Sequence, residues 1–191
     1  MDAMLREATE ASLGADPAGG QQRPGQWFSR WSMAGAALFA TSMPLAGFAL
    51  LHVDPSARVH DAGLLVHLAA LVIGFGAVLT VDWVGLLWAV GKRTFDDVLR
   101  TAGDVTVPIW TGYAGLVASG LCLEPDLTSA LTRVKLGLVV LIGVNGLIAT
   151  ALHGRLVHAP NRVLVVVAGM SAGISQLGWW GALVIGHLNS R

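Results

Sequence analysis

The chain has 191 residues, of which 54% are hydrophobic and only 13% are charged. Soluble domains carry about 25% charged residues, so this composition indicates a protein of the lipid bilayer. The formal net charge is zero, which excludes the strong positive field of a nucleic-acid-binding protein. The apolar residues form long unbroken runs, which favours transmembrane helices over a barrel. We therefore expect an all-α, polytopic membrane protein.

Residues 1–31 differ in composition from the rest of the chain. They contain no apolar run, so the sequence predicts no cleavable signal peptide. Residues 16–25 are rich in Pro and Gly, which is typical of a disordered segment. Residues 26–31 mix aromatic and basic side chains, as segments at the lipid headgroups do. We interpret residues 1–31 as a disordered or interfacial cytoplasmic tail and residues 32–191 as one transmembrane helical bundle.

Five segments are each long enough to cross the bilayer. A helix needs about 20 mostly apolar residues to span the hydrocarbon core. Each segment is apolar over about that length, and the connections between the segments are short. The sequence therefore predicts a bundle of about five transmembrane helices, at residues 32–51, 62–91, 105–123, 134–152 and 163–185.

The Lys and Arg residues predict how the bundle is oriented. Cytoplasmic loops of membrane proteins carry an excess of these residues. Eight of the 12 precede the first predicted span or lie in the loops after the second and fourth spans. We therefore predict a multi-pass protein of the cell membrane, with its N-terminus in the cytoplasm and its C-terminus outside.

Small residues recur along three of the predicted helices. In lipid, helices associate through such residues because they let two backbones approach closely. The pattern is typical of packing within a bundle, and it also provides faces for a homo- or hetero-oligomer. The residues are Gly63, Ala70, Gly74 and Ala77 in the second helix, Gly112, Gly115 and Ser119 in the third, and Gly169 and Gly173 in the fifth.

Four of the six histidines fall near the predicted outer boundary of the membrane. Neutral imidazole is the commonest metal ligand in proteins, and histidine is a usual axial ligand of haem iron. A histidine at a helix end is also often only an interfacial polar residue, and this spacing matches no tight ligand motif. The candidate metal ligands are His52, His60, His67 and His187. We interpret His67 and His187 as the best of them, also for a haem.

Asp82 is the only carboxylate well inside a predicted span. It shares a helix face with His67, but 15 residues separate the two, or roughly 22 Å of helix. They therefore cannot form one small site. Asp82 is a buried partner of a Lys or Arg, an interfacial carboxylate, or a proton or cation site on a path that begins at His67.

Two amides lie inside the last two predicted spans. Asn145 could form a hydrogen bond across the helices to Gln176, or to Ser171 and Ser175. Interhelical bonds of this kind contribute about 1 kcal/mol and are usually structural. We interpret Asn145 and Gln176 as residues that hold helices together.

Three short motifs resemble one known family. They are the helix opening from His67 to the glycine pair Gly74 and Gly76, the helix that runs from Lys135 to Asn145, and the helix end at Ser119-Gly120. These motifs are similar to those of the bacterial copper-resistance D type of integral membrane proteins. The resemblance covers about half of the chain and implies metal handling, with copper as the metal, near the outer face.

Three hypotheses of function follow from these patterns. The first is a helical bundle that binds copper or haem b near the outer face, for metal handling or electron transfer. The second is a transporter or channel component that uses Asp82 and His67, and the third is an accessory or assembly subunit. The sequence contains no nucleotide site, nucleophile elbow or zinc-protease motif, so we expect an enzyme only if the protein is a redox protein.

Overall fold

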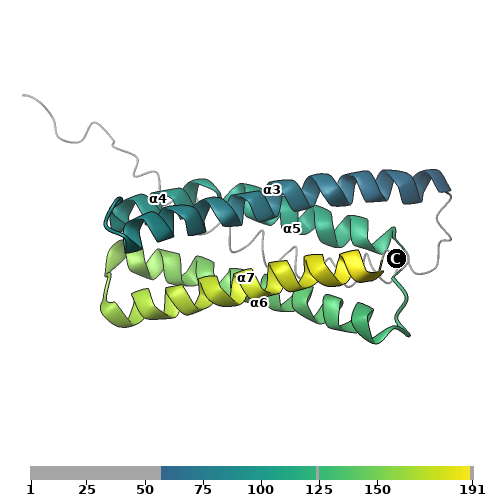
Figure 1. Ribbon diagram of the computed structural model, residues 1–191. Coiled ribbons are helices and arrows are strands. Elements are labelled where there is room, and N and C mark those ends of the chain that lie inside the picture. The colour runs from purple at the N-terminus through teal and green to yellow at the C-terminus, as the bar shows by residue number, and fades with distance from the viewer. Residues whose placement is uncertain (1–56, 124, 190–191) are drawn as a thin grey trace, which may run out of the picture.

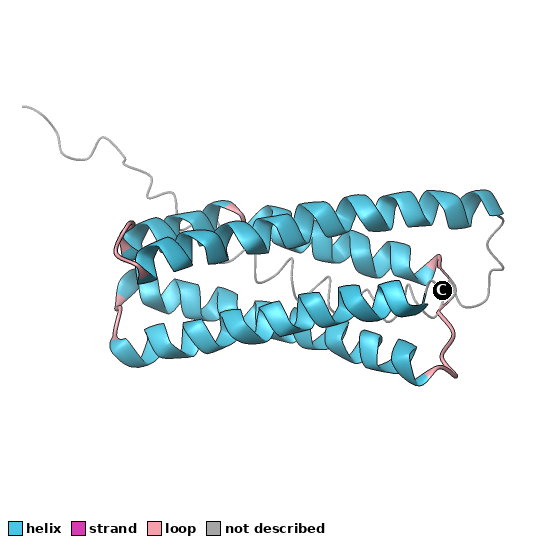
Figure 2. Cartoon of the chain, viewed as in Figure 1, coloured by secondary structure: helices cyan, strands magenta, loops and turns pink. Residues whose placement is uncertain are grey.

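The computed structural model describes residues 57–123 and 125–189. Every regular element in this part of the chain is a helix, which confirms the predicted all-α class there (Figure 2). The predicted tail, the first predicted span at residues 32–51 and the candidate ligand His52 lie outside the described residues. The helices are α3 (Ala57–Ala89), α4 (Phe95–Asp104), α5 (Thr106–Leu121), α6 (Ala130–His158) and α7 (Arg162–Asn189).

Three of the described helices, α3, α6 and α7, are long and apolar enough to cross a membrane. They coincide with the second, fourth and fifth predicted spans, although α6 and α7 extend beyond the predicted ends. Helix α5 lies within the third predicted span, residues 105–123, and has 16 residues. That length corresponds to a rise of about 24 Å, which is shorter than the roughly 30 Å of a hydrocarbon core.

The helices form two antiparallel pairs, α3 with α5 and α6 with α7 (Figure 1). One end of the bundle holds the end of α3, the whole of α4 and the connection between α6 and α7. The other end holds the start of α3, the connection between α5 and α6, and the end of α7. In the predicted orientation, the first of these ends is cytoplasmic and the second is the outer end.

Helices α3 and α5 are in close contact through glycines. A Cβ atom added at Gly112 would overlap the backbone of Gly74, and one added at Gly115 would lie 2.7 Å from the Cβ atom of Ala70. No side chain larger than a hydrogen fits at these two α5 positions unless the helices move apart. The predicted packing through small residues is therefore confirmed for this pair.

The predicted glycine pair of α7 does not pack in the same way. A Cβ atom added at Gly169 or Gly173 would meet nothing within 4 Å in the described structure. Helix α6 contacts α7 further along, at Gly178, where an added Cβ atom would lie 2.7 Å from Cγ1 of Ile142. The glycines that pack on α6 are thus not those that form the motif.

An apolar core joins the two helix pairs near the middle of the bundle. It is centred on Phe75 and Val78 of α3, Ile142 of α6 and Trp179 of α7. The ring of Phe75 stacks on Trp179 with a centroid distance of 5.5 Å, and it meets Trp180 edge-on at 5.1 Å. Aromatic pairs of this kind contribute about 0.5–1.5 kcal/mol beyond the area that they bury.

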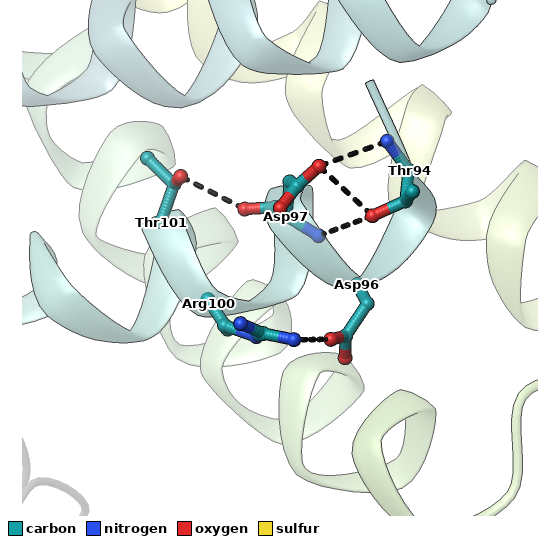
Figure 3. Close-up of polar contacts among 5 residues, drawn as sticks. All are labelled: Thr94, Asp96, Asp97, Arg100 and Thr101. Atoms are coloured by element: carbon teal, nitrogen blue, oxygen red, sulfur yellow. Dashed lines mark hydrogen bonds and ion pairs between the residues drawn. The ribbon is translucent and has the colours of Figure 1, made fainter.

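Helix α4 begins with a capping box (Figure 3). The Thr94 hydroxyl accepts a hydrogen bond from the backbone N–H of Asp97, whose carboxylate accepts from the backbone N–H of Thr94 at 3.0 Å. These bonds lower the pKa of Asp97, with the backbone N–H of Thr94 as the largest cause. The box therefore stabilises α4 above the unfolded pKa of Asp97, and this contribution is lost as the pH falls through the lowered folded value. Arg100 and Asp96 add an ion pair one turn apart.

Nothing in the apolar pattern predicted α4. Its 10 residues include three Asp and one Arg, so they form no apolar run. The ring of Phe95, at the start of α4, lies 5.1 Å from the ring of Trp88 near the end of α3. This contact holds α4 against the end of the bundle that is cytoplasmic in the predicted orientation.

We expect the replacement Gly112→Ala to destabilise the bundle. The new methyl group must push α3 away from α5, and overpacking of this kind costs about 1–3 kcal/mol. Thermal unfolding in detergent measures the effect. Gly76→Ala on α3 is the matched control, because an added Cβ atom there meets nothing within 4 Å. Equal melting temperatures for the two variants would contradict the close contact.

Candidate functional site

A cavity of about 930 Å³ lies between the two helix pairs at the predicted outer end. Sites for small molecules and cofactors are typically about 300–1,000 Å³. Side chains of the apolar core form the floor, and polar side chains surround the mouth. The floor includes Leu71, Tyr113, Ile142, Trp179 and Leu183, and the polar lining includes His60, His67, Asp126, Lys135, His187 and Asn189.

His67 is half-buried on α3 and lines this cavity. Its Nδ1 atom lies 3.0 Å from the hydroxyl oxygen of Ser119 on α5. That hydroxyl donates its own proton to the carbonyl oxygen of Gly115, so its oxygen can accept from an N–H at Nδ1. In the tautomer with the proton on Nδ1, which this contact allows, Nε2 carries the lone pair that could bind a metal. A Cβ atom added at Gly120 would lie 3.6 Å from Cε1 of His67, so the ring packs on that glycine.

The contact between Phe75 and Trp179 places His67 and His187 at the same level. His67 lies eight residues before Phe75, and His187 lies eight residues after Trp179. Because α3 and α7 run in opposite directions, both histidines lie about 12 Å from the stacked rings, towards the same end of the bundle. The two histidines that the sequence favoured also both line this one cavity.

The other candidate histidines are not at this level. His60 lies seven residues before His67, about 10 Å further out, and lines the mouth of the cavity. Residues 57–123 and 125–189 contain no group of three or more His, Cys, Asp or Glu that could hold a metal ion. The described histidines therefore provide two imidazoles at one level rather than a cluster of several ligands.

Lys135 lines the same cavity from α6, and the sequence analysis did not assign it to a site. The amide of Asn189 donates to the hydroxyl of Thr132 at 3.1 Å, which sets the register of α6 against α7. Lys135 lies three residues inward from Thr132, and His187 lies two residues inward from Asn189. Their levels therefore differ by about 1.5 Å. A lysine inside an apolar helix is the signal that could have identified it.

Asp126 lies at the mouth of the cavity, in the connection between α5 and α6. Its Oδ1 atom accepts from the hydroxyl of Thr128 at 2.6 Å and from the backbone N–H of Thr128 at 2.9 Å. These two bonds, the hydroxyl first, lower the pKa of Asp126. Its carboxylate is therefore charged at neutral pH and is held within its own turn.

Asp82 does not line the cavity. Its carboxylate accepts a hydrogen bond from the amide of Gln176 on α7, and the oxygen of that amide accepts from the indole N–H of Trp180 at 2.9 Å. Within the described residues the partner of Asp82 is thus Gln176, not the Lys or Arg that we considered. The chain of bonds joins the two helix pairs.

Asn145 is buried and joins α6 to α7. Its amide N–H donates to the carbonyl oxygen of Ser171 at 2.9 Å, and its oxygen accepts from the Ser171 hydroxyl, also at 2.9 Å. The predicted structural role of Asn145 is confirmed, with Ser171 as its partner. Gln176, the other candidate, is bonded to Asp82 instead.

Comparison of the chain with protein-family models, curated proteins and solved structures found no match. The cavity offers two imidazoles at one level, one ammonium group close to that level, and an apolar floor with aromatic rings. Such a set of groups is typical of a site for a small molecule or cofactor with apolar surface.

We expect Asp82→Ala to destabilise the bundle more than Asp82→Asn does. The alanine leaves the Gln176 amide without its acceptor inside the bundle, which costs about 1–3 kcal/mol. The asparagine keeps an acceptor oxygen at the same place. Thermal unfolding of both variants in detergent tests this expectation. If the asparagine variant is as unstable as the alanine variant, the charge of Asp82 matters rather than its hydrogen bond.

Proposed function

We propose that this chain is an integral membrane protein that binds haem b in the cavity between its two helix pairs, where His67 and His187 would hold the iron. One observation carries the proposal: the two histidines line one cavity at one level, on antiparallel helices that are in contact. Haem iron can take one protein ligand on each face. Two imidazoles at one level are sufficient for that geometry.

The donor set favours haem over a bare copper ion. A dedicated site for a metal ion generally has three or four protein ligands. The described residues include no such group, whereas a haem brings four nitrogen ligands of its own. The copper alternative, which rests on the family resemblance, would need further ligands such as His52, outside the described residues.

The walls of the cavity also suit a porphyrin. Trp179, Tyr113 and the aliphatic side chains of the floor provide apolar surface for its faces. Ser119 holds the His67 ring and directs Nε2 to act as the ligand atom, and such a hydrogen bond also raises the basicity of the ligand. When bound, a haem with two histidine ligands supplies one-electron transfer. The residues of the chain hold it, orient it and exclude water from its apolar edge.

The setting that we propose is the cell membrane. Three long apolar helices support a bilayer location. We propose five spans, with the N-terminus in the cytoplasm and the C-terminus outside, which places the cavity in the outer half of the membrane. The described basic residues support this orientation: Lys92, Arg93, Arg100, Arg155 and Arg162 lie at the α4 end, against Arg58, Arg133 and Lys135 at the cavity end.

The transporter alternative receives less support from the described residues. It requires a path between His67 and Asp82. His67 lines the cavity, but Asp82 lies about 22 Å further along α3 and is hydrogen-bonded to Gln176. This arrangement suits a contact between helices better than a step on an ion path.

We expect the wild-type protein in detergent to take up haem and to show the Soret and visible bands of iron with two imidazole ligands. His67→Ala and His187→Ala should each abolish this six-coordinate spectrum. His158→Ala should leave it unchanged, because His158 is exposed at the opposite end of the bundle. Since only the neutral ring binds iron, the affinity should fall as the pH is lowered. Wild-type protein that takes up no haem on titration would contradict the proposal.

The proposed topology predicts opposite locations for the two chain ends. In intact cells, a tag fused to the N-terminus should be protected from external protease, and a tag fused after Arg191 should be cleaved. A tag inserted in the loop after α3, next to Lys92, is the internal control and should be protected. If both terminal tags are cleaved, or if both are protected, the two ends lie on the same side of the membrane. The number of spans would then be even, which would contradict the five-span topology.

A further inference from the structure

Lys135 places a positive charge in an apolar setting. It is half-buried on α6 and lines the cavity, and no ion pair involves it among the described residues. An ammonium group inside a membrane helix costs free energy unless it reaches water or meets an opposite charge. The ammonium group of Lys135 lies at the level of the bundle where we place the ligand.

The acidic residue of the cavity lining does not meet this need. Asp126 is exposed at the mouth and engaged by two hydrogen bonds from Thr128 in its own turn. The remaining polar lining near Lys135 consists of hydroxyl, amide and imidazole groups, among them Thr132, Asn189 and His187. The inner wall of the cavity thus combines the Lys135 ammonium group with these groups and with apolar surface.

We propose that the ammonium group of Lys135 binds a carboxylate of the ligand, so that the cavity selects a flat, apolar molecule with an acidic group at one edge. This inference rests on the proposed function, in which that group is a propionate of haem b. His67 on α3 and His187 on α7 hold the iron, and Lys135 on α6 fixes the edge of the porphyrin. The three residues come from three different helices at nearly one level.

Three contacts therefore define the orientation of the ligand. Two axial bonds leave a porphyrin free to turn about the axis through the iron. An ion pair at the edge removes this freedom, because only one rotation brings a propionate to Lys135. A charged hydrogen bond of this kind is typically about twice as strong as a neutral one.

The test compares haem b with its dimethyl ester, in which both carboxylates are neutral. We expect wild-type protein to bind the acid more tightly than the ester by about tenfold or more, the typical effect of a hydrogen bond to a charged group. Lys135→Gln should weaken the binding of haem b by a similar factor and leave the ester unaffected. Lys135→Arg keeps the charge and should retain the preference for the acid.

Arg133→Gln is the matched control. Arg133 lies on the same helix, is exposed, and donates to the backbone oxygens of Leu127 and Thr128 at 3.2 and 3.0 Å, outside the cavity. This variant removes the same charge two residues away, and it should bind both compounds as the wild type does. A general effect of positive charge near the mouth would instead appear in both variants and would overturn the inference.

The possible results separate the two proposals. Equal affinity of the wild type for acid and ester, with a six-coordinate spectrum in both, overturns the role of Lys135 and leaves haem binding intact. Uptake of neither compound overturns both proposals. The ester complex of Lys135→Gln also reports folding, because an unchanged spectrum requires both histidines in place. If that variant does not fold, the wild-type comparison and Lys135→Arg decide the question.

Discussion

The contact between Phe75 and Trp179 is the constraint on which the rest of the site depends. Close packing at glycines holds α3 against α5 and α6 against α7. These contacts do not determine how one helix pair packs on the other. The stacked rings join the pairs and set the register of α3 against α7. Trp179 also lines the cavity, so this contact lies at the inner end of the cavity and sets which residues of the two helices lie at one level above it.

The polar contacts inside the bundle also divide into those within a helix pair and those between the two pairs. Each satisfies groups that would otherwise be unpaired in an apolar setting, and each contributes about 1 kcal/mol. Within the pairs, His67 contacts Ser119, Asn145 contacts Ser171, and Asn189 contacts Thr132. Between the pairs, Gln176 donates to Asp82, and the Tyr113 hydroxyl donates to the carbonyl oxygen of Val139.

The long helices could be predicted from the sequence because an apolar run of about 20 residues reports a span whatever its partners are. The use of Gly74 and Gly112 for helix packing could also be predicted, since small residues repeat along one face of each helix, but their pairing with each other could not. Helix α4 could not, because a capping box and an ion pair hold a polar segment that has no apolar run. The apolar pattern of a helix indicates how deep each residue lies in the membrane, but it does not indicate which helices are in contact. The depths of His67 and His187 in the membrane could therefore be predicted. Their shared cavity could not, because it depends on the contact between Phe75 and Trp179, which are far apart in the sequence.

The cavity lies on the seam between two helical hairpins, and this position has a consequence for the assembled protein. A ligand in the seam contacts both hairpins at once, so its binding energy adds to the cohesion of the halves. A ligand present at a thousand times its dissociation constant stabilises a folded protein by about 4 kcal/mol. Without a ligand, the contacts that join the hairpins among the described residues are the apolar core, the Asp82–Gln176 bond, the bond from the Tyr113 hydroxyl to Val139, and the packing of α4 on α6. Membrane proteases that recognise loosely joined helices would therefore remove empty copies first, and the cellular abundance of the chain would follow the supply of its ligand.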